Sequence, residues 1–175
     1  MVDIDGVLSL FGAPTIAGQR SLAVLAGDPD EQRRARRGRY CSIDGIPHFL
    51  SYDAAAHLLA LADSFELVWA SGWEEKANEH LPHLLGMPGA LPFVRFPRAQ
   101  AQTGDGDGHW KLAAIDSYAG ARALAWIDDG FNPACHAWAS ARAAPTLLVA
   151  TEPEQGLTTR EAQVLQQWAA RLARP

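Results

Sequence analysis

MVDIDGV, residues 1–7, places two carboxylates one residue apart, after an apolar start and directly before a glycine. In a β-strand, residues two apart face the same side, so Asp3 and Asp5 would project together from the end of a strand. Open α/β sheets bind their ligands at the carboxyl ends of the strands. Two carboxylates there could hold a hard divalent cation, or could act as nucleophile and proton carrier. The same string also occurs in turns and calcium loops, so its meaning depends on the rest of the chain.

The composition is that of one globular domain, residues 1–175, with 48% hydrophobic and 20% charged residues. A net charge of −5 argues against bulk binding to nucleic acid or to anionic membranes. Cys41 and Cys135 are too few for a disulfide framework, which fits a reducing, cytoplasmic setting. No apolar run reaches membrane-spanning length and no signal-peptide pattern is visible, so we expect no membrane contact. The sequence does not predict an oligomeric state.

Stretches typical of strands alternate with stretches typical of helices along most of the chain. This alternation predicts an α/β fold with a mostly parallel central sheet of about five strands and helices on both faces. We expect strands at residues 1–3, 65–70, 91–96, 122–127 and 145–150. We expect helices at residues 53–63, 73–85 and 109–118, from Pro133 onward, and from Thr158 or Thr159 to about residue 172. The first strand is short, so either the edge of the sheet is trimmed or the native start lies upstream of Met1.

Residues 8–50 interrupt the alternation after the first strand. Glycines and prolines break up residues 8–38, where we expect at most one short helix, near residues 20–25. Asp44-Gly45 lies between extended flanks in residues 40–50, which predicts a β-hairpin. We interpret residues 8–50 as a small cap or flap insertion, too short for a large cap domain.

A strong basic cluster lies inside this insertion. It consists of Arg33, Arg34, Arg36, Arg37 and Arg39. Such a charge run is usually a solvated face. The alternative is a clamp for phosphates close to the site, because each contact between an arginine and a phosphate adds to the binding of a nucleic acid. The sequence leaves both interpretations open.

Several polar residues fall at the ends of predicted strands or beside them. In chain order they are Asp3, Asp5, Ser71, Lys111, Asp128 and Asp129. Taken singly, each has an ordinary alternative: a turn pair, a helix cap, a solvated lysine or a loop cap. The carboxyl ends of parallel strands meet at one edge of a sheet, so their order and co-location favour a common site.

These residues resemble the four ordered motifs of the haloacid dehalogenase (HAD) superfamily, over residues 3–129. Two stretches, LVWASGWE at 67–74 and LAWIDD at 124–129, resemble more closely the HAD domain of bacterial Swiss Army Knife RNA repair proteins. The resemblance implies a Rossmann-like HAD fold. It also implies a Mg²⁺-dependent phosphatase that hydrolyses phosphomonoesters through an aspartyl-phosphate.

The resemblance assigns the chemical steps and the metal to the acidic residues. Asp3 would be the nucleophile, and Asp5 would protonate the leaving oxygen and then activate water. Mg²⁺ would be held by the carboxylate of Asp3, the backbone carbonyl of Asp5 and the carboxylate of Asp128, with Asp129 assisting. A carboxylate at position 5 is typical of phosphatases in the superfamily and is typically missing from dehalogenases.

The remaining site residues would contact the substrate. The resemblance implies that Ser71 bonds the phosphoryl oxygens and that Lys111 neutralises their charge together with that of Asp3. Gly72 belongs to the same motif. Trp73 could stack a base or sugar beside the site, or could pack in the core.

A lightly capped site would admit a bulky substrate, so we expect a phosphorylated partner such as a nucleotide or a nucleic-acid end. The alternative function is a non-catalytic phosphate- or RNA-binding module that keeps the HAD fold. Other candidate sites are weaker. We interpret His80 and His83 as a surface pair, and Asp105 and Asp107 as a loop that lacks the later ligands of a calcium site.

Overall fold

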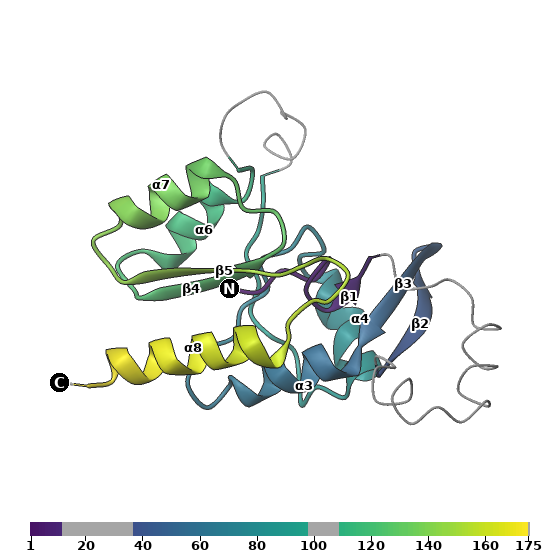
Figure 1. The fold of residues 1–175 in the computed structure, drawn as a ribbon. Helices are drawn as coiled ribbons and strands as arrows, with labels where there is room; N and C mark the ends of the chain where they lie inside the picture. The colour runs from purple at the N-terminus through teal and green to yellow at the C-terminus, as the bar shows by residue number, and fades with distance from the viewer. Residues whose placement is uncertain (12–36, 98–108, 175) are drawn as a thin grey trace.

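A computed structural model describes residues 1–11, 37–97 and 109–174 of the chain (Figure 1). The short helix predicted near residues 20–25 lies outside the described residues. So does most of the loop predicted at 97–108, with Asp105 and Asp107. Of the basic cluster, Arg33, Arg34 and Arg36 also lie outside them, whereas Arg37 and Arg39 are described and exposed.

The centre of the fold is a parallel pair of strands, β4 (Leu124–Asp128) and β5 (Thr146–Ala150). All five residues of β4 are buried, as expected for a strand covered on both faces. In Figure 1, α6 (Leu112–Ala119) and α7 (Pro133–Ala141) cover one face of this pair, and α8 (Thr159–Leu172) covers the other. The chain therefore has the predicted α/β architecture with helices on both faces.

Single parallel bridges continue the pairing beyond β4. Val2 bridges Ile127 on one side and Trp69 on the other, and Trp69 in turn bridges Phe93. The predicted segments at residues 1–3, 65–70 and 91–96 thus lie side by side in the expected direction. In each segment, however, only one residue forms bridges, where a full strand was predicted. Pro92 gives a local reason, because proline has no N–H to donate to a neighbouring strand.

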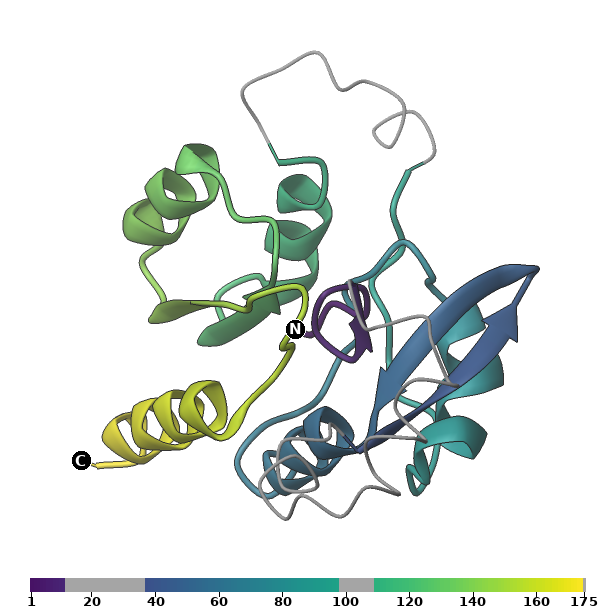
Figure 2. The ribbon, with the colours of Figure 1, turned by 45° about the vertical axis from the view of Figure 1, so that its right-hand side comes forward.

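The predicted hairpin is confirmed and belongs to a second, antiparallel sheet. This sheet contains β1 (Ser9–Leu10), β3 (Ile46–Ser51) and β2 (Gly38–Ile43), in that spatial order. Asp44 and Gly45 both have positive φ angles, 52° and 80°, as a two-residue type I′ turn requires. Figure 2 shows the N-terminal turn between this hairpin and the half of the molecule that contains β4 and β5.

The helix ends follow the local sequence. Asn132 accepts a hydrogen bond from the N–H of Cys135 and caps α7, and Thr158 forms a capping box with Glu161 at the start of α8. The helix α3 (Tyr52–Ala60) lies beside α8 in Figure 1. No helix in the described parts of the chain is long and apolar enough to cross a membrane.

The helix predicted at residues 73–85 begins later, because α4 spans Lys76–Leu85. Glu74 has a φ of +47°, a left-handed conformation that an α-helix cannot contain. Its carboxylate accepts a hydrogen bond from the backbone N–H of Phe96 at 2.6 Å. The segment after Ser71 is therefore a fixed turn, and the helix starts only beyond it.

Large aromatic side chains fill the interior. Trp69 and Trp126 are fully buried, on two parts of the parallel array that the segment of Val2 separates. The indole N–H of Trp69 donates to Asn78, so its polar atom is paired. The prediction that Trp69 packs in the core is confirmed.

Thr151 joins two of the segments that carry site residues. Its backbone N–H donates to the carbonyl of Asp128 at 3.1 Å, and its buried hydroxyl donates to the carbonyl of Gly6 at 2.9 Å. The loop after β5 thereby holds the loop after β4 and the turn after the first segment together.

We expect Thr151→Val to lower the free energy of unfolding by about 1–3 kcal/mol, because the valine leaves a buried carbonyl without its donor. Thr151→Ser keeps the hydroxyl and is the matched control. Urea denaturation of the three proteins measures the difference. Equal losses for valine and serine would show that the hydrogen bond to Gly6 contributes nothing.

Candidate active site

The centre of the site is one lysine between two carboxylates. The Nζ atom of Lys111 lies 2.7 Å from Oδ2 of Asp3 and 2.7 Å from Oδ2 of Asp128. All three residues are buried, with exposed fractions of 4%, 6% and 2% respectively. Buried charges are costly unless they are paired, so this contact fixes the three side chains against one another.

Asp128 has further donors on both of its oxygens. The indole N–H of Trp126 donates to Oδ2 at 3.1 Å, and the backbone N–H of Gly130 donates to Oδ1 at 3.0 Å. Trp126 and Asp128 stand two apart on β4 and therefore share one face of the strand. The carboxylate of Asp128 is thus oriented by its own strand and by the loop that follows.

The turn at residues 109–111 brings Lys111 to this point. Its backbone N–H donates to Nδ1 of His109, and its ammonium lies 5.3 Å from the ring centre of Trp110. The lysine is the N-cap of α6, directly before its first residue, because the helix begins at Leu112 and not at residue 109 as predicted. Burial lowers the pKa of His109, against the opposing effect of the nearby Asp128 carboxylate.

A third carboxylate completes an acidic cluster. Asp3, Asp128 and Asp129 each offer an oxygen, and these oxygens all lie within 4.8 Å of one another. Gly6 makes the approach of Asp129 feasible, because a Cβ atom at Gly6 would lie 2.3 Å from Oδ2 of Asp129. The structure therefore brings three of the predicted acidic residues together, whereas the side chain of Asp5 lies apart from them.

The electrostatics of the cluster favour a cation. Burial raises the pKa of Asp3 to about 6, with Lys111 lowering it and Asp128 raising it further. Burial also raises the pKa of Asp129, and the charge of Asp128 adds to this effect. Three carboxylates share one ammonium, so negative charge is in excess. Oxygen donors with excess negative charge are the ligand set that a hard divalent cation prefers, and the residues present fit such an ion.

Asp5 lies outside this cluster and has partners of its own. Its side chain is 38% exposed, and its Oδ2 accepts a hydrogen bond from the indole N–H of Trp73 at 2.9 Å. His48 of β3 approaches from the other side, with Nδ1 at 3.9 Å from Oδ1. The two aspartates of the opening stretch therefore meet different surroundings, one dry and one open to solvent.

Ser71 and Gly72 follow the segment that bridges Val2. Ser71 is buried, whereas Gly72 is exposed beside the ring of Trp110. The parallel pairing of Val2 with Trp69 puts Ser71 at the same end of the array as Asp3. Their placement agrees with the expected motif, but the structure shows no role for either residue.

Sequence reasoning missed three residues of the site. Trp126 could have been found from its position two residues before Asp128, and Thr151 from its position directly after a strand. His48 gives no such signal, because a histidine in a hairpin strand has many ordinary uses. It reaches Asp5 only through the folding of the antiparallel sheet.

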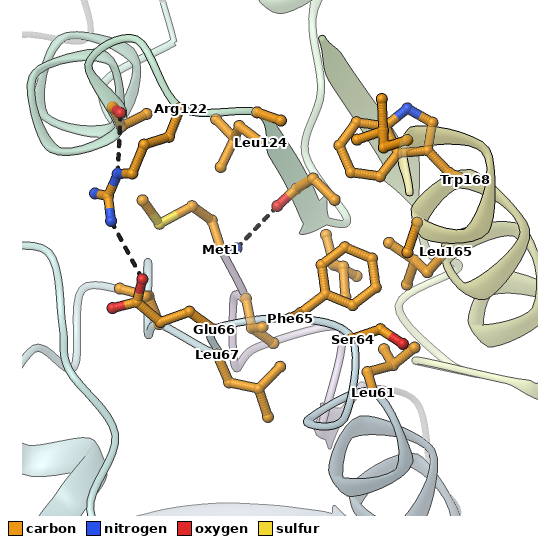
Figure 3. Close-up of a pocket in the computed structure, with 18 of the residues that line it drawn as sticks. Met1, Leu61, Ser64, Phe65, Glu66, Leu67, Arg122, Leu124, Leu165 and Trp168 are labelled. Carbon is orange, nitrogen blue, oxygen red and sulfur yellow. Dashed lines mark hydrogen bonds and ion pairs between the residues drawn. The ribbon is translucent and has the colours of Figure 1, made fainter. Parts of the chain in front are cut away.

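A separate cavity of about 420 Å³ lies at the other end of the parallel segments, away from the aspartates (Figure 3). Its lining is mainly apolar, with Phe65, Leu165 and Trp168 on one side. The ion pair between Arg122 and Glu66 stands at another side of it. None of the clustered aspartates lines this cavity, so it is separate from the candidate active site.

The comparison with known families agrees with this geometry. The model of one family, described as the HAD domain in Swiss Army Knife RNA repair proteins, matches residues 1–162. The chain belongs to this family. No curated protein and no solved structure matches it. The resemblance inferred from the sequence is therefore confirmed, and membership supports a hydrolase of the HAD type in general.

In this HAD domain, Gly6→Ala should displace Asp129, because the new methyl group would overlap its carboxylate. A matched control is Gly86→Ala. Gly86 has nearly the same φ, +67° against +70° for Gly6, but open space where its Cβ would lie. Each variant should lose about 1–2 kcal/mol of stability from the left-handed backbone. We expect Gly6→Ala to lose more, and thermal denaturation with equal losses would contradict the close approach.

Proposed function

We propose that this HAD domain is a Mg²⁺-dependent phosphatase that hydrolyses phosphomonoesters through an aspartyl-phosphate. The observation that carries the proposal is the buried contact of Lys111 with Asp3 and Asp128, with Asp5 outside it. Phosphoryl transfer mainly requires positioning and the neutralisation of charge. A dry carboxylate beside a fixed ammonium meets both requirements.

In the first step, an oxygen of Asp3 attacks the phosphorus atom and forms a new P–O bond, while the bond from phosphorus to the leaving oxygen breaks. Asp5 gives its proton to that oxygen, which departs as an alcohol. In the second step, Asp5 takes a proton from a water molecule, and the water oxygen attacks the phosphorus atom. Inorganic phosphate leaves and the carboxylate of Asp3 is restored.

The positions of the two aspartates suit this division of work. Asp3 is held by an ammonium and shielded from water, so its oxygen can be directed at the phosphorus atom. Asp5 is partly exposed, so an alcohol can leave past it and a water molecule can arrive. Lys111 offsets the negative charge that Asp3 and the phosphoryl group bring together.

The acidic cluster would hold the metal. The carboxylates of Asp3 and Asp128 and the backbone carbonyl of Asp5 are the proposed ligands, with Asp129 assisting directly or through water. Mg²⁺, when bound, supplies positive charge that offsets the charge of the phosphoryl oxygens. The hydroxyl of Ser71 would bond those oxygens, with Gly72 beside it.

The proposed substrate is a nucleotide or a nucleic-acid end that carries a phosphate. The family description, which refers to RNA repair, supports this class. The small antiparallel sheet supports it as well, because a short flap admits a large substrate more readily than a full cap domain does. Arg37 and Arg39 are exposed at the start of the hairpin, which is compatible both with a solvated face and with the alternative of a phosphate clamp. We further propose that residues 1–175 form a single domain that works in the cytoplasm.

We expect Mg²⁺ to bind the wild-type protein without substrate, measured by titration calorimetry. Asp128→Asn should weaken this binding on the order of tenfold or more, because the cluster loses one of its negative charges. Asp63→Asn, which changes an exposed aspartate in a turn far along the chain, is the matched control. Unchanged binding in Asp128→Asn would contradict the metal assignment.

We expect the wild-type protein with Mg²⁺ to release phosphate from an aryl phosphate and from oligonucleotides phosphorylated at the 3′ or 5′ end. Asp3→Asn should release none, since an amide cannot form the acyl-phosphate. The purified Asp3→Asn variant should be checked for deamidation before the assay. Tight binding of the oligonucleotides by a wild-type protein without turnover would favour the non-catalytic binding module instead.

A further inference from the structure

The carboxylate of Asp5 is held from two sides. The indole N–H of Trp73 donates to its Oδ2 at 2.9 Å, and Nδ1 of His48 lies 3.9 Å from its Oδ1. One partner comes from the turn before α4 and the other from β3 of the hairpin. Both are distant from Asp5 in the sequence, so the contacts exist only in the folded protein.

His48 is itself fixed in place. Its Nδ1 lies 2.9 Å from the hydroxyl of the buried Ser9, and the side chain is only 11% exposed. Its ring meets that of Trp73 edge to face, with the ring centres 4.9 Å apart at an angle of 71°. Such edge-to-face pairs are favourable beyond the area they bury. The hairpin thereby supports the indole that bonds Asp5.

The turn that carries Trp73 is equally constrained. Glu74 has its left-handed φ of +47° and accepts the N–H of Phe96, which ties the turn to the neighbouring segment. Strained backbone of this kind persists only where the surrounding structure determines it, and it is frequent at functional sites. Trp73 also packs against the main core cluster, so its indole has little freedom to leave Asp5.

Asp5, His48 and Trp73 together line a pocket of about 330 Å³, and Phe11 and Ile46 also belong to its lining. The open side of the Asp5 carboxylate therefore faces a space that could receive the departing alcohol. The indole N–H donates to Oδ2, so Oδ1 is the oxygen that would carry the proton.

We propose that Trp73, supported by His48, is the positioning residue that holds Asp5 as the proton donor to the leaving group. The inference rests on the proposed phosphatase activity and adds two residues to it. Trp73 acts through Asp5 and not by stacking on the substrate. In the step concerned, Oδ1 of Asp5 gives up its proton to the leaving oxygen as the bond from that oxygen to phosphorus breaks and the bond from Asp3 forms.

The way in which the loss of activity depends on the acidity of the leaving group separates a positioning role of Trp73 from its other possible roles. A nitrophenolate leaves without help, whereas an alkoxide requires protonation. We therefore expect Trp73→Phe to lower kcat/KM for an alkyl phosphate by roughly 10- to 100-fold, part of the usual contribution of a general acid. For p-nitrophenyl phosphate the loss should stay below about threefold. The quantity kcat/KM is chosen because it reports the steps up to the departure of the alcohol.

Four further variants complete the experiment. Asp5→Asn should show the same dependence on the leaving group, and Trp73→Phe combined with Asp5→Asn should lose no more than Asp5→Asn alone. Trp138→Phe is the matched control, because it removes an indole N–H from an exposed carboxylate, that of Asp116, away from Asp5. His48→Asn keeps a polar group toward Ser9 but removes the ring beside Trp73. It should show the same pattern in weaker form and provides the test if Trp73→Phe folds poorly.

The outcomes are distinguishable. Equal losses on both substrates, or a higher KM for both at unchanged kcat, would overturn the positioning role; the second result would indicate stacking on the substrate. A further loss in the double variant would overturn it too. If the wild-type protein hydrolyses neither substrate, the proposed function itself fails. If Asp5→Asn depends on the leaving group and Trp73→Phe does not, only the present inference fails.

Discussion

The rest of the site depends on one interaction, the buried ion pairing of the Lys111 ammonium with the carboxylates of Asp3 and Asp128. An uncompensated buried charge in that position would cost several kcal/mol. Removal of any one of the three side chains would leave such a charge on another. Asp129 adds a further carboxylate that the single lysine does not balance. The cluster thus carries an excess of negative charge in a mostly buried setting, which a divalent cation would offset.

The backbone that supports this cluster pairs through few bridges. Val2 makes one bridge on each side, yet these bridges fix the register of the segment that carries Asp3 relative to Ile127 and Trp69. Beyond these bridges, side chains determine the geometry: Trp126 orients Asp128, and Thr151 connects the loops after β4 and β5 to the turn at Gly6. Precise placement of the carboxylates comes more from these hydrogen bonds than from long regular strands.

The sequence predicted those parts of the site that depend on simple geometry. The carboxyl ends of parallel strands lie at one edge of a sheet, so Asp3 and Asp128 could be placed together from strand order. Lys111 begins a helix, and the resemblance to the HAD motifs was needed to add it. Asp44-Gly45 was sufficient for the hairpin. The partners of Asp5 could not be predicted. The direction in which Trp73 points depends on the left-handed turn at Glu74, and no pattern of residue types indicates that turn. The position of His48 depends on how the hairpin packs, which is a property of the whole fold.

Peptide mass mapping during turnover shows whether Asp3 takes up the phosphoryl group covalently. The protein should be mixed with substrate and Mg²⁺, quenched in acid during turnover, digested and mapped. We predict the added mass of one phosphoryl group on the peptide that contains Asp3, and its loss after treatment with hydroxylamine, which cleaves acyl-phosphates. Turnover with no modified Asp3 peptide at any quench time, or with the phosphoryl group on another residue, would contradict covalent transfer to Asp3.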